Sequence, residues 1–139
     1  QINVAIILDG SSSISRQDFQ DEQSFAEDIV DAFAARNLFD NGGMAAYVQY
    51  ASFVPTSGMF DSAQDFNDFA AADVQVGGGT TTSLGIDEGT ALLGANLATV
   101  SFMIVISDGQ SKNTIETVAA ADRARTEGII IFAVGVGEF

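Results

Sequence analysis

Apolar residues gather in short runs along this chain, and three of the runs are almost unbroken. An unbroken run of this length is typical of a strand that is buried on both faces, as in a parallel sheet. The segment 44–53 alternates imperfectly and also predicts a strand, and 54–60 fits its hairpin partner because Pro55 suits a strand end. We therefore expect a sheet with three buried strands, at residues 2–8, 102–106 and 129–136.

The longest stretch between these runs, 16–36, has helical periodicity. Phe19, Phe25 and Phe33 fall on one helical face and are expected in the core, whereas most acidic residues fall elsewhere and are expected on a solvated face. A serine followed three residues later by an aspartate resembles a capping box at the start of the helix.

Three shorter helices are expected at residues 62–71, 83–93 and 113–127. Each is expected to turn an apolar stripe toward the sheet. The inward residues should be Leu84, Ile86 and Leu92 in the second of these helices, and Ile115, Val118, Ala119 and Ala121 in the third.

Strands that alternate with helices in this order predict an α/β fold with three layers, in which helices cover both faces of a mostly parallel central sheet. The chain shows no internal repeat, linker or low-complexity tail, so we expect a single domain over residues 1–139. No apolar run approaches the roughly 20 residues of a membrane span, so membrane insertion is not expected. The chain opens on Gln1 without a signal peptide, which indicates a mature form or a fragment of a larger protein.

Composition narrows the chemistry that this fold can carry. The chain has neither Cys nor His, which excludes disulfides, thiolate or imidazole metal ligands, and a Ser-His-Asp triad. Five Lys and Arg residues stand against 19 Asp and Glu residues, for a formal net charge of −14. A surface this negative repels phosphate backbones and anionic lipid, so nucleic-acid and membrane-surface partners are not expected. It suits hard cations and basic partners.

Two of the predicted buried strands end in Asp-Gly, at Asp9 and at Asp108. In open α/β sheets, ligands bind beyond the carboxyl ends of the strands. Ser11 and Ser13 follow Asp9 in a D-x-S-x-S spacing that can turn all three side chains to one side of an extended turn. Oxygen ligands of this kind select hard cations such as Mg²⁺, Mn²⁺ or Ca²⁺. Because they leave the metal shell incomplete, the ion could still accept a carboxylate.

Three separated segments, in this order, resemble the von Willebrand factor type A family, which includes the inserted domains of integrins. The first is the D-x-S-x-S turn after the first strand, and the second is the Gly-Gly-Thr-Thr-Thr-Ser-Leu-Gly-Ile stretch at 78–86. The third is Ser-Asp-Gly at 107–109, after an apolar strand, and the closing segment 132–137 is similar to the fifth strand of the family. Together these segments span nearly the whole chain.

By this resemblance, the chain holds a metal-ion-dependent adhesion site for Mg²⁺, or alternatively for Mn²⁺ or Ca²⁺. The open position on the metal would take an Asp or Glu carboxylate from a protein or matrix partner. The implied setting is adhesion in the extracellular space or at the cell surface, with no catalytic residues. The implied ligands are Ser11 and Ser13 directly, Asp9 and Asp108 directly or through water, and Thr80 (preferred over Thr82 by its spacing to Ile86) when the partner is bound.

The chain departs from the family pattern in two places. Ser12 stands where the family usually has glycine, and we expect little effect because serine is small. Family members also continue beyond the segment that resembles the fifth strand, with a last strand and a C-terminal helix. This sequence ends at Phe139, so we expect either a minimal or truncated version of the fold or a last strand and helix that the given sequence does not include.

Two alternatives remain open beside the binding module. A haloacid-dehalogenase-like phosphatase would use Asp9 as its nucleophile and Asp108 as a Mg²⁺ ligand. That family has a second Asp where this chain has Ser11, and Lys112 is only loosely placed for its lysine. The other alternative is a structural assembly module of a larger extracellular protein, with a vestigial metal site.

Overall fold

The computed structural model describes residues 1–96, 98–109 and 111–137. In this part of the chain, strands and helices follow one another in the order that the sequence predicts. The elements are β1 (Ile2–Asp9), α1 (Arg16–Ala34), β2 (Met44–Tyr50), β3 (Thr56–Phe60), α2 (Ala63–Ala72), α3 (Thr82–Ala95), β4 (Val100–Ser107), α4 (Thr114–Thr126) and β5 (Ile130–Gly135).

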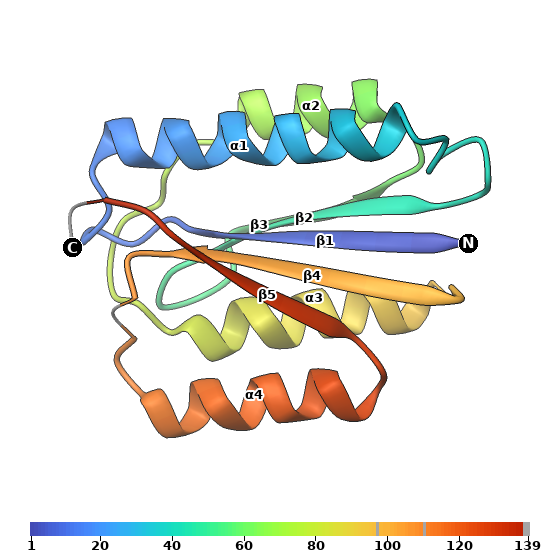
Figure 1. Ribbon diagram of the computed structural model, residues 1–139. Coiled ribbons are helices and arrows are strands. Elements are labelled where there is room, and N and C mark those ends of the chain that lie inside the picture. The colour runs from blue at the N-terminus through green and yellow to red at the C-terminus, as the bar shows by residue number, and fades with distance from the viewer. Residues whose placement is uncertain (97, 110, 138–139) are drawn as a thin grey trace.

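The strands form one sheet in the order β3-β2-β1-β4-β5. β1 pairs in parallel with both β2 and β4, and β5 pairs in parallel with β4. Only β3 runs antiparallel, as the hairpin partner of β2. Helices α1 and α2 cover one face of the sheet, and α3 and α4 cover the other (Figure 1). The prediction of a three-layer α/β fold with a mostly parallel sheet is therefore confirmed.

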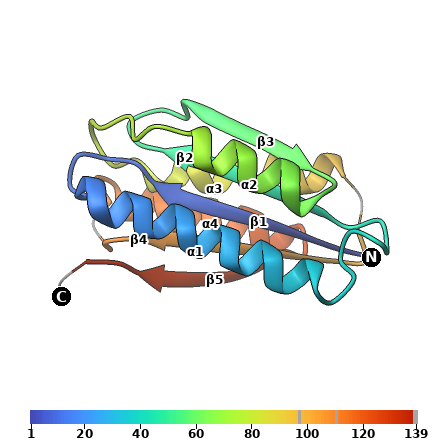
Figure 2. The same cartoon turned by 90° about the horizontal axis from the view of Figure 1, so that it is seen from above.

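The core consists of two apolar layers, one on each side of the sheet. Alternate residues of β1 supply both layers: Ile6 points into the layer under α1 and α2, and Ile7 points into the layer under α3 and α4. Because β1 is buried on both faces and lies at the centre of the sheet, its carboxyl end is held rigidly. Figure 2 shows β1 between β2 and β4, seen from above.

Helix α1 begins as predicted and buries most of the predicted stripe, with Phe19 in the core and Phe33 packed against it. The Ser15 hydroxyl accepts a hydrogen bond of 3.0 Å from the backbone N–H of Asp18, which caps the helix. The buried positions include Phe19 and Glu22, whereas Phe25 is 39% exposed. The predictions of a core Phe25 and of a solvated Glu22 were therefore wrong: Glu22 lies three residues after Phe19 on the buried stripe, and Phe25 faces the partly open edge of the sheet.

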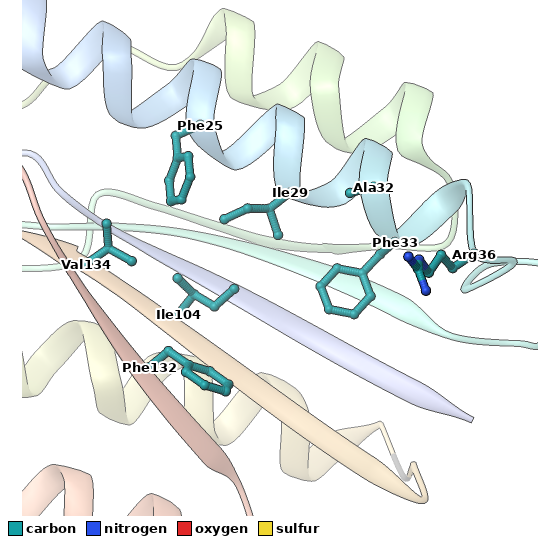
Figure 3. Close-up of a pocket in the computed structure, with 8 residues that line it drawn as sticks. All are labelled: Phe25, Ile29, Ala32, Phe33, Arg36, Ile104, Phe132 and Val134. Carbon is teal, nitrogen blue, oxygen red and sulfur yellow. The ribbon is translucent and has the colours of Figure 1, made fainter.

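Phe25 instead borders an apolar groove between α1 and β5, with a volume of about 490 Å³. Figure 3 shows Phe25 and Phe33 on the helix side of this groove and Phe132 and Val134 on the strand side. Phe132 is 52% exposed. The prediction that β5 is buried on both faces was therefore wrong, because β5 lies at the edge of the described sheet.

Helix α3 lies close to the sheet because small residues face it. A Cβ at Gly85 would come within 2.5 Å of the Tyr50 ring, and one at Gly89 within 2.7 Å of Ile7. Ile86 is buried as predicted, but Leu84 is 38% exposed, since the glycine side of the helix contacts the sheet.

Helix α4 is also held by small side chains. Its buried residues are Ala120 and Ala124, whereas Ile115 and Val118 are 81% and 52% exposed, so the predicted inner stripe was wrong for both. In the described residues, no helix combines the length and apolarity that a bilayer span requires.

Candidate metal centre

The first loop of the candidate centre begins at Asp9, the fully buried last residue of β1. Asp9 Oδ1 accepts a hydrogen bond of 3.0 Å from the backbone N–H of Ser11. The chain turns at Gly10, where a Cβ would lie 2.1 Å from Gln49 Oε1, so glycine is needed for this close approach. The turn brings the hydroxyl oxygens of Ser11 and Ser13 to 2.9 Å from each other. The D-x-S-x-S spacing thus gathers one carboxylate and two hydroxyls.

The second loop is hydrogen-bonded to the first. Gly77 donates its backbone N–H to the Gly10 carbonyl over 2.8 Å, and Ser12 donates its own to the Gly78 carbonyl over 2.9 Å. The Ser12 hydroxyl accepts a third bond, of 2.7 Å, from the backbone N–H of Gly78. Gly77 and Gly78 have φ angles of 77° and 89°, which favour glycine. Ser12 therefore links the two loops, a role that the sequence did not indicate.

Thr80 follows directly and lies at the surface of this loop pair. Its carbonyl accepts a hydrogen bond of 2.9 Å from the backbone N–H of Lys112. Within the described residues, no hydrogen bond joins the Thr80 side chain to Asp9, Ser11 or Ser13. Thr82, the alternative threonine, is buried in the first turn of α3. Thr80 is thus the more accessible of the two, half-buried beside the first loop.

The third loop meets the first through Ser107, the last residue of β4. Its hydroxyl donates a hydrogen bond of 3.1 Å to Asp9 Oδ2 and accepts one of 3.2 Å from the backbone N–H of Gly109. Asp108 lies between them and is half-buried, and its charge raises the pKa of Asp9. Ser107 is part of the Ser-Asp-Gly motif, but the sequence did not indicate that it would hold Asp9.

Charge at this centre is negative and poorly solvated. Burial raises the pKa of Asp9 above its ordinary value, hydrogen bonds from Ser11 and Ser107 lower it, and the charge of Asp108 raises it further. The two oxygens of Asp9 are thus held by donors from different loops.

Glu22 adds a carboxyl group beneath the first loop. It is fully buried, and its Oε1 accepts a hydrogen bond of 3.3 Å from the backbone N–H of Asp9. Its Oε2 has no hydrogen-bond partner in the described part of the chain. Burial, followed by the charge of Asp9, raises the pKa of Glu22 to about 9. Its position three residues after Phe19 on the helix stripe is the signal that could have found it.

These residues fit a hard divalent cation. A buried carboxylate, a second acidic side chain and hydroxyls from the same turn offer oxygen ligands, and no lysine or arginine of the described residues forms an ion pair with Asp9. The described residues contain no group of three or more Asp, Glu, His or Cys side chains arranged to hold a metal ion. A metal here would therefore depend on serine and threonine hydroxyls as well.

A model of the von Willebrand factor type A domain matches residues 3–138 of this chain. The collagen alpha-4(VI) chain of Mus musculus is 29% identical in an alignment that covers 96% of this chain and 6% of that protein. Matrilin-4 of Homo sapiens is 29% identical, with 99% of this chain and 23% of the relative covered. Integrin alpha-D of Homo sapiens is 27% identical, with 99% of this chain and 12% of the relative covered. This chain thus spans less than a quarter of each of these relatives.

Solved structures show the same fold. Proximal thread matrix protein 1 from the mussel byssus, solved with a zinc-occupied MIDAS motif, superposes with a TM-score of 0.84 at 23% identity. The match covers 99% of this chain and 38% of that one. The pilus adhesin SpaC from Lactobacillus rhamnosus GG has a TM-score of 0.77 at 14% identity, over 96% of this chain and 24% of that one.

Proposed function

This chain belongs to the von Willebrand factor type A family, and from that premise we propose that it is a divalent-metal-dependent binding module. In matrilins, collagens and integrins, domains of this family are adhesion and structural modules, not enzymes. The metal would be held by Asp9, Ser11, Ser13, Thr80 and Asp108, and it would capture a carboxylate of the partner. The observation that carries the proposal is that two hydrogen bonds converge on the Asp9 carboxylate. One comes from the backbone N–H of Ser11, and the other from the hydroxyl of Ser107, 98 residues further along the chain.

Mg²⁺ is the cation we propose, with Mn²⁺ or Ca²⁺ as alternatives. Carboxylate and hydroxyl oxygens are hard ligands, and the chain offers no Cys or His to favour a softer ion. When bound, the ion would supply a positive charge and an open coordination position for an Asp or Glu side chain of the partner. Ser11 and Ser13 orient their hydroxyls toward each other, and Ser107 fixes the Asp9 carboxylate.

A phosphatase reaction at Asp9 is less consistent with the residues of this turn. That class needs a second Asp two residues after the nucleophile as acid and base, and this chain has Ser11 there, with its hydroxyl 2.9 Å from that of Ser13. We therefore place the phosphatase hypothesis, and an assembly module with a vestigial metal site, behind the binding module.

The location expected from the sequence is extracellular or at the cell surface, and the relatives agree with it. Matrilins, collagens and integrins are extracellular or cell-surface proteins. The partner that we propose is a protein or matrix component that presents an Asp or Glu carboxylate. Because the chain spans only a small part of its relatives, this proposal concerns the partner of this domain alone and not the partners of a whole protein.

Calorimetric titration with MgCl₂ tests the proposal. We expect one binding site per chain, lost in Asp9→Ala and in Ser11→Ala, and lost for all chains in excess EDTA. Asp40→Asn is the matched control, since Asp40 is exposed in the loop after α1, far from the strand ends that carry the centre. Equal Mg²⁺ affinity in Asp9→Ala and the wild type would falsify the assignment of this site.

A further inference from the structure

Basic residues are rare in this chain, which has five Lys and Arg residues and 19 Asp and Glu residues. Arg123 of α4 forms an ion pair of 2.8 Å with Asp87 of α3, and Arg125 pairs with Asp122 of its own helix. Arg36 lines the apolar groove beyond the end of α1. The remaining two basic residues are Arg16 and Lys112. Arg16 directly follows the first loop in the sequence, and the backbone of Lys112 is hydrogen-bonded to Thr80 of the second loop.

Lys112 is attached to the second loop. Its backbone N–H donates to the Thr80 carbonyl over 2.9 Å. Its ammonium group extends over the neighbouring glycine, because a Cβ at Gly79 would lie 3.4 Å from Lys112 Nζ. The residue is exposed, and no acidic side chain among the described residues forms an ion pair with it. A positive charge is therefore available beside Thr80.

Arg16 lies on the other side, next to the first loop. It lines a cavity of about 450 Å³ between α1 and the segment that follows α2. Gln75, on the wall of this cavity, donates from Nε2 to the carbonyls of Ser11 and Ile14 over 3.0 and 2.8 Å. The cavity is thus joined directly to the turn that carries the candidate metal ligands.

The one carboxylate that lines this cavity is directed elsewhere. Asp73 accepts hydrogen bonds from Tyr47, Gln49 and Thr56 at 2.6, 2.7 and 2.9 Å. Within the described residues, Arg16 has no ion pair with Asp73 or with any other acidic side chain. Its guanidinium group is therefore available for a carboxylate that enters from outside, in the bidentate geometry that arginine favours.

We infer that the partner is an acidic segment, an inference that rests on the proposed function. One carboxylate of this segment binds the metal, a second binds Arg16 in the adjoining cavity, and a third faces Lys112. The net charge of the whole chain favours a basic partner at long range. At physiological ionic strength, however, screening acts over roughly 8 Å, so the contact is decided by the charges next to the centre: Arg16, Lys112, a bound metal ion and the carboxylates of the centre itself. Asp31 lies near the end of α1, away from the loop that carries Ser11 and Ser13, whereas Asp18 lies in the first turn of α1, close to that loop.

Fluorescence anisotropy with three labelled glycine-rich peptides tests this inference in saturating MgCl₂. Each peptide has a central aspartate, and the residues two positions to either side are aspartate, asparagine or lysine. We expect the aspartate-flanked peptide to bind about fivefold to tenfold more tightly than the asparagine-flanked one, as two partly exposed ion pairs would give. The lysine-flanked peptide should bind most weakly.

Substitutions assign the preference to the two cations. Arg16→Gln and Lys112→Gln should each reduce the preference for aspartate flanks, and the double variant should reduce it to less than about twofold. Affinity for the asparagine-flanked peptide and for Mg²⁺ should stay within about twofold of the wild type. Arg36→Gln is the matched control: it removes the same charge far from the site and should keep the full preference.

Each outcome separates the inference from the proposed function. Metal-dependent binding without a preference for aspartate flanks, or with a preference for lysine flanks, contradicts the inference and leaves the proposed function standing. A preference that survives in the double variant also contradicts it. If no peptide binds in MgCl₂, or if binding persists in EDTA, the proposed function itself fails and the inference fails with it.

Discussion

Glu22 is a buried carboxyl group of the candidate centre, and its burial makes its ionisation unfavourable. Its side chain is fully buried next to Asp9, and its pKa is raised from 4.5 to about 9, first by burial and then by the charge of Asp9. The folded chain therefore keeps a proton that the unfolded chain releases above about pH 4.5. The stability that this proton supports is complete below pH 4.5 and is lost progressively as the pH rises through about 9.

Glu22→Gln should remove this pH dependence. In EDTA, we expect the variant and the wild type to have similar free energies of unfolding at pH 5, and the variant to be more stable by about 1–3 kcal/mol at pH 8. Urea denaturation across this pH range measures the difference. Glu127→Gln, an exposed carboxylate at the end of α4, is the control and should show no such divergence. A constant difference between Glu22→Gln and the wild type at every pH would argue against a buried, protonated Glu22.

The sequence identifies loop residues better than it identifies what supports them. Asp9, Ser11 and Ser13 are found because a local turn fixes their spacing, and the structure gathers them in one turn. Glu22 and Ser107 are not found, because their contacts with Asp9 cross 13 and 98 residues of chain. The helical stripe through Phe19 indicates that Glu22 is buried, but nothing in the local pattern reports that Glu22 or Ser107 contacts Asp9.

At the scale of the element, packing decides what periodicity leaves open. The sequence predicts each strand and helix, since apolar runs and helical repeats depend on near neighbours. It misplaces the buried sides of α3 and α4, because small residues make the contacts there, and that of β5, because β5 lies at the edge of the described sheet. α3 approaches the sheet through Gly85 and Gly89, and α4 through Ala120 and Ala124. A hydrophobicity count gives these residues too little weight.

Gly85→Ala should therefore destabilise the fold. The added methyl group would meet the Tyr50 ring and Ile7 at 2.5 and 2.8 Å, and overpacking of this kind costs about 1–3 kcal/mol. Thermal and urea unfolding measure the loss. Gly94→Ala on the same helix is the matched control: its Cβ would meet only the end of the Glu127 side chain, at 3.2 Å, so the gain in helix propensity should leave it neutral or stabilised. Equal losses in the two variants would contradict the close contact at Gly85.

At the scale of the molecule, the net charge of −14 and the candidate centre act together. Like charges repel across the folded chain, and a cation bound at Asp9 and Asp108 would reduce that repulsion where carboxylates are closest. A metal that binds only the folded state also stabilises it by mass action.

MgCl₂ should raise the melting temperature of this chain more than NaCl of the same ionic strength does. At 100 times the dissociation constant, binding adds about 2.7 kcal/mol to the free energy of unfolding. Scanning calorimetry measures the shift. Asp9→Asn should lose the extra effect of Mg²⁺ and keep the effect of NaCl, whereas Asp40→Asn should keep both. If Mg²⁺ and NaCl act equally on the wild type, the ion only screens charge.

The open side of β5 has a consequence for handling the protein. This strand has no charged residue, no second neighbour in the described sheet and the groove of Figure 3 beside it, so two molecules could pair edge to edge. Mutual repulsion between anionic copies is what opposes such pairing. Acidification toward pH 4 or concentrated salt weakens that repulsion, so colloidal stability should fail there well before the fold does.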